Sequence, residues 1–321
     1  MALKILTLHF TINSPFKPAI FYTTMAERKN DGKSRSRNTK KEHPFEKFKS
    51  SRKPSKKSPG REGTSGTPGK LHGHAREGAA KRQTEIRLNR FIANAGICSR
   101  READEYIKAG HITVNNKVVK EVGTRVAIGD TVRFKGKRLD PEKKVYILLN
   151  KPKDFITTVD DPRARKTVME LVRNACPERI YPVGRLDRLT TGLLLFTNDG
   201  DLAAKLTHPS HGAVKIYQAS LDRPLDIEDM KKIADGVDLE DGHVKVDEIA
   251  YTDEADRSEV GIRLHSGKNR IIRRIFGHFD YKVTKLDRVF FAGLTKKNLP
   301  RGKWRFLNEK EIVKLKMNIF R

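Results

Sequence analysis

The sequence has little of what disulfide-stabilised, zinc-binding and membrane proteins need. Only two cysteines, Cys98 and Cys176, occur in 321 residues, and neither belongs to a CxxC pair. This scarcity argues against a disulfide framework and against a zinc site made of thiolates. We expect both cysteines to be small buried side chains in a reducing compartment. No run approaches the ~18 consecutive apolar residues of a membrane-spanning helix, so we expect no membrane partner.

The charge balance points to a polyanionic partner. The chain carries 67 Lys and Arg against 40 Asp and Glu, a net charge of +27. Such an excess disfavours compaction and favours binding to nucleic acid or an anionic surface. Because no membrane segment is present, nucleic acid is the better interpretation. The apolar fraction of 36% is low for a chain that is folded throughout, so part of it is expected not to pack into a core.

The unpacked part is predicted to be residues 1–84. Residues 26–84 hold 18 Lys and Arg against 6 Asp and Glu, with Ser, Gly and Pro filling most of the rest. Such a segment buries too little apolar surface to offset chain entropy, so we predict a disordered basic tail. It would bind phosphates without regard to sequence, or serve only as a solubilising tail. Residues 1–24 differ in composition, and we expect natural translation to begin at Met25.

Residues 85–134 read as a compact module of two helices and a small sheet. Residues 86–93 have helical apolar spacing, and Gly96 follows as a C-cap. Ser99 opens a second helix as N-cap of a capping box completed by Glu102, and this helix closes at Gly110. Short strands are predicted at 111–114, 117–119 and 131–134.

A Lys-rich linker, residues 135–144, is predicted to lead into a second domain at 145–317. Its strands are predicted at 145–149, 192–197, 214–219, 260–264 and 303–307. Its helices are predicted at 167–173, 201–206, 227–234 and 269–279. Strands interspersed with short helices, without a strict βαβ repeat, indicate an α+β fold with a mixed, largely antiparallel sheet.

The first module resembles the αL RNA-binding motif of ribosomal protein S4. The resemblance rests on residues 87–103 (RLNRFIANAGICSRREA) and 110–115 (GHITVN), which match in order and spacing. It implies that the basic side chains of the module contact RNA phosphates. The residues concerned are Arg87, Arg90, Arg100, Arg101 and Lys108. For any single one of them, a solvated helix face is an equally good interpretation.

Residues 181–192 of the second domain concentrate charged residues, threonines and glycines just before an apolar strand. Within this stretch, Asp187 lies on a loop just before a buried strand, a common placement for an active-site carboxylate. Taken alone, such an Asp is more often a turn or capping residue. However, residues 184–200 (GRLDRLTTGLLLFTNDG) resemble the signature of the pseudouridine synthases, and in particular the RsuA/RluB-type branch that pairs an S4-type module with the catalytic domain. The resemblance covers residues 85–310 and is nearest to the large-subunit members.

The resemblance implies three catalytic residues. Asp187 would be the invariant aspartate. Tyr217, in residues 215–217 (KIY), would pack against the target base. Arg273, in residues 267–274 (GKNRIIRR), would pair with the aspartate and keep it ionised. Arg185, Lys268 and Arg270 would contact RNA.

Two of these assignments have open alternatives. Tyr217 is also interpretable as an ordinary strand aromatic, and Arg273 as a phosphate contact. The opening residues 149–153 (LNKPK) fit the family as well, although Asp154 stands where the family usually has glycine, which puts the turn there in doubt.

The chemistry suits these residue types. Isomerising uridine to pseudouridine breaks the N-glycosidic bond, turns the uracil and rejoins it through C5, after the base has been flipped out of its stack. A carboxylate can act as the nucleophile or can remove a ribose proton in an elimination route, and both routes stay open. Neither needs a metal or a small-molecule cofactor, and we expect none.

The prediction is therefore a cytoplasmic, monomeric enzyme that modifies a specific uridine in ribosomal RNA or in a pre-ribosomal particle, more narrowly in the large subunit. A non-catalytic ribosome assembly factor with the same fold is the alternative. It would have no use for Asp187, Tyr217 and Arg273 together. A metal-dependent hydrolase that uses Asp187, Asp199 and Asp201 is disfavoured, because residues 198–201 look like a turn and a helix cap.

Overall fold

The structure is a computed structural model that describes residues 85–253 and 255–319. The predicted basic tail, residues 1–84, and the predicted start at Met25 lie outside the described residues. None of the described helices is long and apolar enough to cross a membrane.

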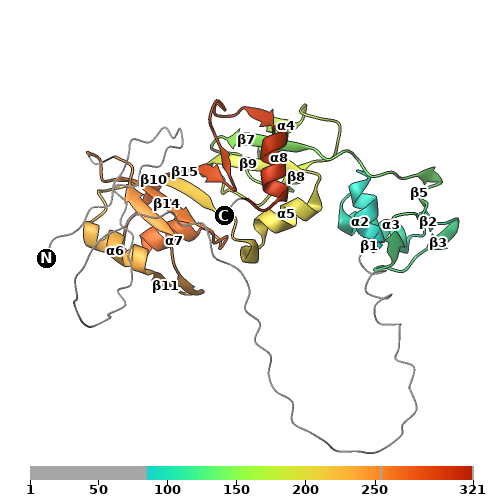
Figure 1. The fold of residues 1–321 in the computed structure, drawn as a ribbon, viewed down its shortest axis with the longest axis horizontal. Helices are drawn as coiled ribbons and strands as arrows, with labels where there is room; N and C mark the ends of the chain where they lie inside the picture. The colour runs from blue at the N-terminus through green and yellow to red at the C-terminus, as the bar shows by residue number, and fades with distance from the viewer. Residues whose placement is uncertain (1–84, 254, 320–321) are drawn as a thin grey trace, which may run out of the picture. The chain divides into compact units, whose positions relative to one another are not determined.

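The N-terminal module packs two helices against short strands, around one apolar core (Figure 1). Ser99 caps the second helix through the predicted capping box with Glu102, and Gly110 follows that helix with a positive φ of 75°. The core includes Leu88, Ile92 and Ile107, all fully buried. The helices of the module are α2 (Leu88–Asn94) and α3 (Arg100–Lys108). Its strands are β1 (Glu85–Arg87), β2 (Ile112–Val114), β3 (Lys117–Val119), β4 (Arg125–Ala127), β5 (Val132–Phe134) and β6 (Lys137–Arg138).

Two details of the module differ from the sequence prediction. Residues 86 and 87, predicted as the start of a helix, form strand β1, which pairs with β4. The linker predicted at 135–144 is wrong in its first part, because β6 pairs with β5 in a hairpin. For β1 the partner strand lies elsewhere in the chain and overrides the local pattern, whereas β6 follows its partner β5 directly across a short turn.

The second domain is built on one nine-stranded sheet. The order along the sheet is β13-β14-β10-β15-β9-β7-β17, with β8 beside β9 and β16 beside β15. All pairs are antiparallel except β9 with β15. Its strands are β7 (Tyr146–Lys151), β8 (Tyr181–Pro182), β9 (Thr191–Thr197), β10 (Lys215–Leu221), β13 (Glu248–Tyr251), β14 (Glu259–Leu264), β15 (Val283–Phe291), β16 (Leu294–Thr295) and β17 (Trp304–Phe306). The predicted α+β class and the mixed, largely antiparallel sheet are confirmed.

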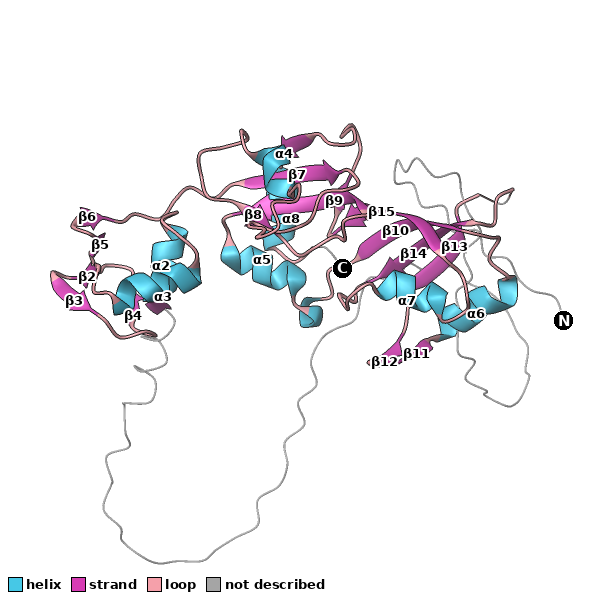
Figure 2. Cartoon of the chain, turned by 180° about the vertical axis from the view of Figure 1, so that it is seen from behind, coloured by secondary structure: helices cyan, strands magenta, loops and turns pink. Residues whose placement is uncertain are grey.

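Helices cover the two halves of this sheet and form separate apolar cores (Figure 2). Helices α6 and α7 pack on the half made of β10 and β13 to β15, whereas the cores around α4, α5 and α8 belong to the half made of β7 to β9. The helices are α4 (Val168–Val172), α5 (Gly200–Thr207), α6 (Ile227–Asp235), α7 (Ile271–Gly277) and α8 (Glu309–Lys316), with a short 3₁₀ turn at Pro209–His211. A separate hairpin joins β11 (Val237–Leu239) to β12 (Gly242–Val244).

The two halves meet at the short parallel contact between β9 and β15. Gly192, which has a positive φ of 106°, pairs there with Arg288. A Cβ atom on residue 192 would lie 2.3 Å from the carbonyl oxygen of Arg288, so only glycine allows the strands this close. The contact matters because the loop before β9 and the strand β15 both border the cleft described below.

Candidate active site

The loop between β8 and β9 holds the predicted nucleophile. Leu186 is buried in the core of the β7 to β9 half, and Thr190 is buried at the end of the loop. Asp187 lies between them and is exposed. The buried residues on either side therefore fix the backbone and leave this carboxylate at the surface of a cleft.

Two side chains from the β7 side bind the backbone of this loop. Lys151 is completely buried, and its Nζ donates hydrogen bonds to the carbonyl oxygens of Asp187 at 3.0 Å and Thr190 at 2.8 Å. It also donates to the carbonyl oxygens of Pro152 and Arg188. Thr157 Oγ1 donates to the carbonyl oxygen of Leu186 at 2.7 Å and accepts from its N–H at 3.2 Å.

Burial of Lys151 lowers the pKa of its ammonium to about 8, and the nearby Arg301 acts in the same direction. The carboxylates of Asp187 and Asp154 oppose this shift. The ammonium therefore stays charged at neutral pH largely because acceptors and acids surround it.

Asp154, which stands where the family usually has glycine, does not disrupt the turn. It adopts the left-handed conformation that glycine favours, with φ of 69°. Its N–H donates to the carbonyl oxygen of Arg188 at 2.9 Å, and its carboxylate pairs with Arg188 Nη1 at 2.8 Å. The substitution thus adds one exposed ion pair to the loop that carries Asp187.

A cleft of about 440 Å³ opens beside Asp187. Its lining brings together residues that are far apart in the sequence, from the loop before β9, from β10, from the segment before α7 and from β15. Predicted site residues that line it are Arg185, Asp187, Tyr217, Lys268 and Arg270. Tyr217 is half-buried and packs against the apolar cores of both halves of the sheet.

Three cations that were not predicted as site residues also line the cleft, namely Arg188, Lys215 and Arg288. Lys215 Nζ donates to the carbonyl oxygen of His265 at 2.9 Å, and more weakly to those of Ala213 and Ser266. Burial lowers the pKa of this ammonium to about 8, the neighbouring Arg288 lowers it further, and Asp247 opposes both. Arg288 is only 3% exposed.

Arg273 does not line the cleft and makes no direct ion pair with Asp187, although both residues are described. It is half-buried on α7, where its Nη1 donates to the carbonyl oxygen of Val283 at 2.6 Å and its Nη2 is buried without a partner. Burial lowers the pKa of its guanidinium, Asp187 raises it and Arg270 lowers it. Arg273 therefore lies within electrostatic reach of Asp187 and retains an unused donor.

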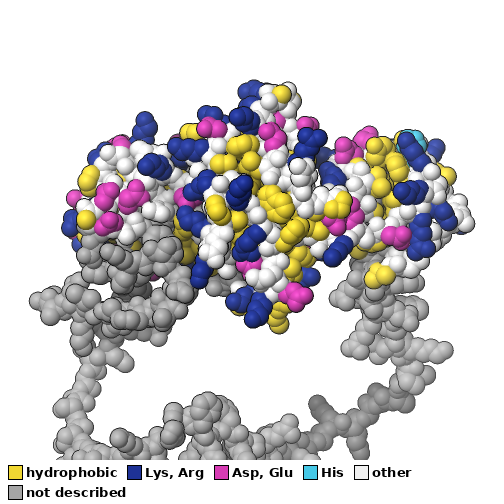
Figure 3. All heavy atoms as spheres, turned by 90° about the horizontal axis from the view of Figure 1, so that it is seen from above, with side chains coloured by type: hydrophobic (Ala, Val, Ile, Leu, Met, Phe, Trp, Pro, Cys, Tyr) yellow, Lys and Arg dark blue, Asp and Glu magenta, His cyan; other side chains and the backbone are white. Residues whose placement is uncertain are grey.

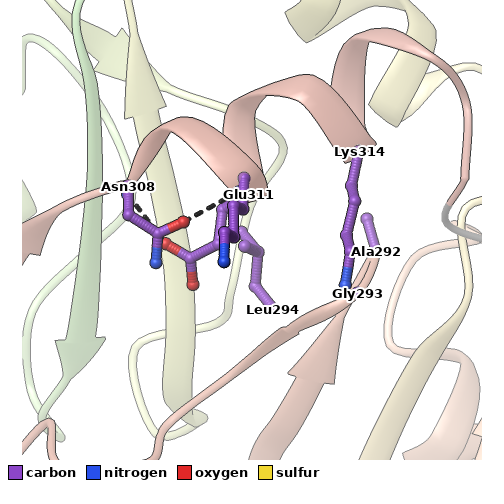
Figure 4. Close-up of a pocket in the computed structure, with 7 residues that line it drawn as sticks. Ala292, Gly293, Leu294, Asn308, Glu311 and Lys314 are labelled. Atoms are coloured by element: carbon purple, nitrogen blue, oxygen red, sulfur yellow. Dashed lines mark hydrogen bonds between the residues drawn. The ribbon is translucent and has the colours of Figure 1, made fainter.

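Other concave or polar groups offer less chemistry. A smaller cavity of about 250 Å³ lies between α8 and the β15–β16 turn, and Figure 4 shows Asn308 and Glu311 bonded to each other across the start of α8. These two side chains form a capping box, which explains their polarity. In the described part of the chain no three His, Cys, Asp or Glu side chains gather as a metal site. Asp199 caps α5, as predicted from the sequence.

The comparisons with known proteins match both domains. Residues 145–278 match the RNA pseudouridylate synthase family, and residues 86–132 match the S4 domain. An RNA pseudouridine synthase of Aquifex aeolicus (strain VF5), itself uncharacterized, is 39% identical over 234 residues, which are 72% of this chain and 94% of that protein. The chain belongs to the pseudouridine synthase family.

Further relatives of the synthase support this assignment. The ribosomal large subunit pseudouridine synthase B of Bacillus subtilis (strain 168) is 39% identical over 233 residues, covering 72% of this chain and 95% of that protein. The dual-specificity RNA pseudouridine synthase RluF of Escherichia coli (strain K12) is 35% identical over 239 residues, covering 72% of this chain and 79% of that protein. A crystal structure of a pseudouridylate synthase superposes with a TM-score of 0.52 at 27% identity, covering 72% of this chain and 99% of that one.

The cations predicted to contact RNA occupy different environments in the synthase. Arg87, Arg100, Arg101, Arg185 and Arg270 are exposed, whereas Arg90 is half-buried. Lys108 pairs with Glu105 at 3.0 Å. Lys268 donates to the carbonyl oxygen of Asp241 at 2.8 Å. On the face in Figure 3, Lys and Arg side chains are spread over the described surface rather than gathered into one patch.

The candidate site therefore combines two groups of residues. Asp187 and Tyr217 were found through their motifs, and the structure brings them to one cleft. Lys151 and Arg288 were missed. Lys151 lies in the LNKPK stretch, which was noted without assigning it a role, and Arg288 lies in strand β15, which was not predicted. The signal for Lys151 would have been a charged residue at the end of an apolar strand, whereas Arg288 lies in a strand with two further charged residues and gives no such signal.

Proposed function

We propose that this enzyme isomerises a specific uridine in ribosomal RNA, more narrowly in large-subunit RNA, with Asp187 as the catalytic carboxylate. The 39% identity with the Bacillus subtilis protein named a ribosomal large subunit pseudouridine synthase, over 95% of its length, carries the choice of substrate. The S4 domain supports an RNA substrate. Action as a cytoplasmic monomer on ribosomal RNA or a pre-ribosomal particle, without a cofactor, completes the proposal.

The geometry of the cleft supports this choice of residues. The target uridine flips out of its stack and enters beside Tyr217, whose ring offers a face for the uracil. Exposed Arg185 and Arg270 at the cleft bind flanking phosphates. The Arg273 Nη2, which has no partner among the described residues, is available to Asp187 once RNA excludes water from the cleft.

The proposed reaction balances without any added reactant. Asp187 attacks C1′ of the ribose, or removes a ribose proton, and the C1′–N1 bond breaks with its electron pair passing to the uracil. The uracil then turns and C5 bonds to C1′, which breaks the bond between Asp187 and C1′ or, on the elimination route, is accompanied by return of the ribose proton. The C5 proton is lost and N1 takes up a proton, so that substrate and product are isomers.

Pseudouridine mapping tests the proposal. Ribosomal RNA is prepared from cells with and without the gene, treated with carbodiimide and read by reverse-transcriptase stops. We expect one stop in large-subunit RNA to disappear with the gene and to return with the wild type but not with Asp187→Ala. Loss of the stop that Asp187→Ala fully restores would point instead to a non-catalytic assembly role.

A reaction in vitro separates the enzyme from its cellular context. Purified protein and a transcript spanning the mapped site, labelled with tritium at C5 of uridine, should release tritium to water. Transcripts of the small-subunit RNA serve as the matched control. Tritium release only from small-subunit RNA would move the proposed substrate to that subunit.

A further inference from the structure

Arg288 is a buried cation that lines the cleft. It lies on β15, opposite Tyr217 on one neighbouring strand and opposite Gly192 on the other. It is 3% exposed and still belongs to the cleft lining. Its guanidinium lies over the ring of Phe291, 4.5 Å from the ring centre, which restrains the plane of the guanidinium.

The hydrogen bonds of Arg288 are incomplete. Its Nε donates to the carbonyl oxygen of Leu193 at 2.8 Å. Nη2 is buried and has no acceptor, and no carboxylate within residues 85–253 and 255–319 forms an ion pair with this guanidinium. A buried guanidinium normally binds its donors to carboxylates or carbonyl oxygens, because an unpaired buried charge is strongly unfavourable.

Two neighbouring buried lysines differ from Arg288 in this respect. Lys151 donates to four carbonyl oxygens and Lys215 to three, so their ammonium groups are fully used by the protein. Arg288 alone of these three keeps unused donors beside the cleft. A buried donor without a partner that also lines a cleft is available to an acceptor that enters the cleft, whether water or a ligand.

We propose that Arg288 donates a hydrogen bond to a carbonyl oxygen of the target uracil and stabilises the negative charge that the base gains as the C1′–N1 bond breaks. The departing electron pair spreads from N1 onto O2 and O4, and a fixed cation beside one of these oxygens lowers the energy of that state. Arg288 would thus bind the leaving base, whereas Asp187 acts on the sugar.

A uracil carbonyl fits this position better than a phosphate. Phosphates remain on the backbone of the RNA, where the exposed Arg185 and Arg270 are available to bind them. Arg288 is almost fully buried and lies across from Tyr217, so a flat base that enters the cleft reaches it more readily than a tetrahedral phosphate does. The uracil and the phosphate both offer an oxygen acceptor. Replacing single oxygen atoms of the base or of the phosphate by sulfur distinguishes the two.

The test combines variants with modified substrates. Single-turnover rates are measured for the wild type, Arg288→Lys and Arg288→Met on RNA with uridine, 2-thiouridine or 4-thiouridine at the target, or with a phosphorothioate on its 5′ side. We expect Arg288→Met to slow the reaction about 100- to 1,000-fold, with RNA affinity changed less than about threefold because phosphate contacts dominate affinity. One thio base should slow the wild type about tenfold and should have no further effect on Arg288→Met.

Arg263→Met is the matched control. Arg263 lies in the same sheet, also has a buried nitrogen without a partner, and does not line the cleft. It should keep the wild-type response to the thio bases. If Arg288→Met fails to fold, Arg288→Lys carries the test, because a lysine keeps the charge but changes the geometry of its donors and should weaken the thio effect.

The outcomes distinguish this inference from the proposed function on which its substrate rests. A wild type that does not convert the uridine RNA contradicts the proposed substrate. A wild type that converts it, with thio effects of equal size in wild type and in both Arg288 variants, overturns the role of Arg288. A phosphorothioate effect that disappears in Arg288→Met would also overturn it, since the acceptor would then be the phosphate.

Discussion

Lys151 and Arg288 are both almost completely buried, but they have opposite hydrogen-bonding states. Lys151 is 0% exposed and donates to carbonyl oxygens of the Asp187 loop on every side, whereas Arg288 is 3% exposed and uses one nitrogen. A cation whose donors are all used by the backbone holds a loop in place. A cation with unused donors beside a cleft is available to bind a substrate. Burial alone does not distinguish the two, and only the acceptors around each cation do.

The largest expected effect separates the Asp187 carboxylate from the loop that carries it. Asp187→Asn should abolish pseudouridine formation, because an amide cannot act as the nucleophile or as a base. Lys151 bonds the backbone of residue 187 rather than its side chain, so the free energy of unfolding should stay within about 0.5 kcal/mol of the wild type. Tritium release and denaturant unfolding measure the two quantities. Activity near the wild-type level would refute the assignment of Asp187.

Lys151→Met tests whether the buried Lys151 holds the Asp187 loop in place. The change leaves the carbonyl oxygens of Asp187 and Thr190 without their donor, and an unsatisfied buried polar group costs about 1–3 kcal/mol. We expect the free energy of unfolding to fall by about 2–3 kcal/mol. Denaturant unfolding measures this change. Arg288→Met should lower stability less, and a larger loss in Arg288→Met than in Lys151→Met would reverse the comparison.

The pH dependence of the free energy of unfolding tests the contribution of Lys151 further. Burial lowers the pKa of Lys151 in the folded protein to about 8, below its ordinary value of 10.5. Between these two values the unfolded chain holds a proton that the folded protein has released, so the contribution of Lys151 to stability rises with pH and is lost again as pH falls to 8. The difference in unfolding free energy between wild type and Lys151→Met should therefore grow from pH 8 to pH 10. Lys215, which titrates near the same pH, is common to both proteins and cancels.

The smallest effect is expected at the exposed ion pair on this loop. Asp154→Gly removes the pair with Arg188, whose two side chains are 59% and 57% exposed, and exposed pairs contribute at most about 1 kcal/mol. Glycine also relieves the positive φ of 69° at this position. We expect a change in the free energy of unfolding below about 0.5 kcal/mol and nearly unchanged turnover. A large loss of turnover would show that this surface pair, rather than buried Lys151, positions Asp187.

The elements predicted well from the sequence are those with local signals. The capping box of Ser99 and Glu102, the apolar run of β9 and the cap of α5 at Asp199 each depend on neighbours within a few residues. The mixed, largely antiparallel sheet followed from the spacing of such elements.

Strand β15, at nine residues one of the longest, was missed because Lys285, Asp287 and Arg288 break its apolar pattern. Asp287 is largely buried there. Burial acts to raise its pKa, but hydrogen bonds from Arg301, Lys296 and Thr191 outweigh burial and leave the pKa lowered. Its hydrogen-bond partners lie up to 96 residues away, so no local sequence pattern predicts them.

The candidate site also contains residues that local motifs indicate and a pairing that they do not settle. Asp187 and Tyr217 could be selected from the sequence because their motifs are contiguous. The structure brings both to one cleft, and their catalytic roles stay predictions. The pairing of Arg273 with Asp187 stays a prediction, since the two interact electrostatically without direct contact in the described residues.

The sequence by itself determined which residues carry charge and chemistry, because a motif, a capping box or an apolar strand needs only its immediate neighbours. Only the tertiary structure decided which of those charges remain available. Lys151 is fully used because the carbonyl oxygens of residues 187–190 fold around it from 36 or more positions away. Arg288 is left with unused donors because the parallel contact of β9 and β15 supplies it with one acceptor, at Leu193. The hydrogen bonds of a buried cation depend on where distant backbone oxygens come to lie, and that placement exists only in the folded sheet.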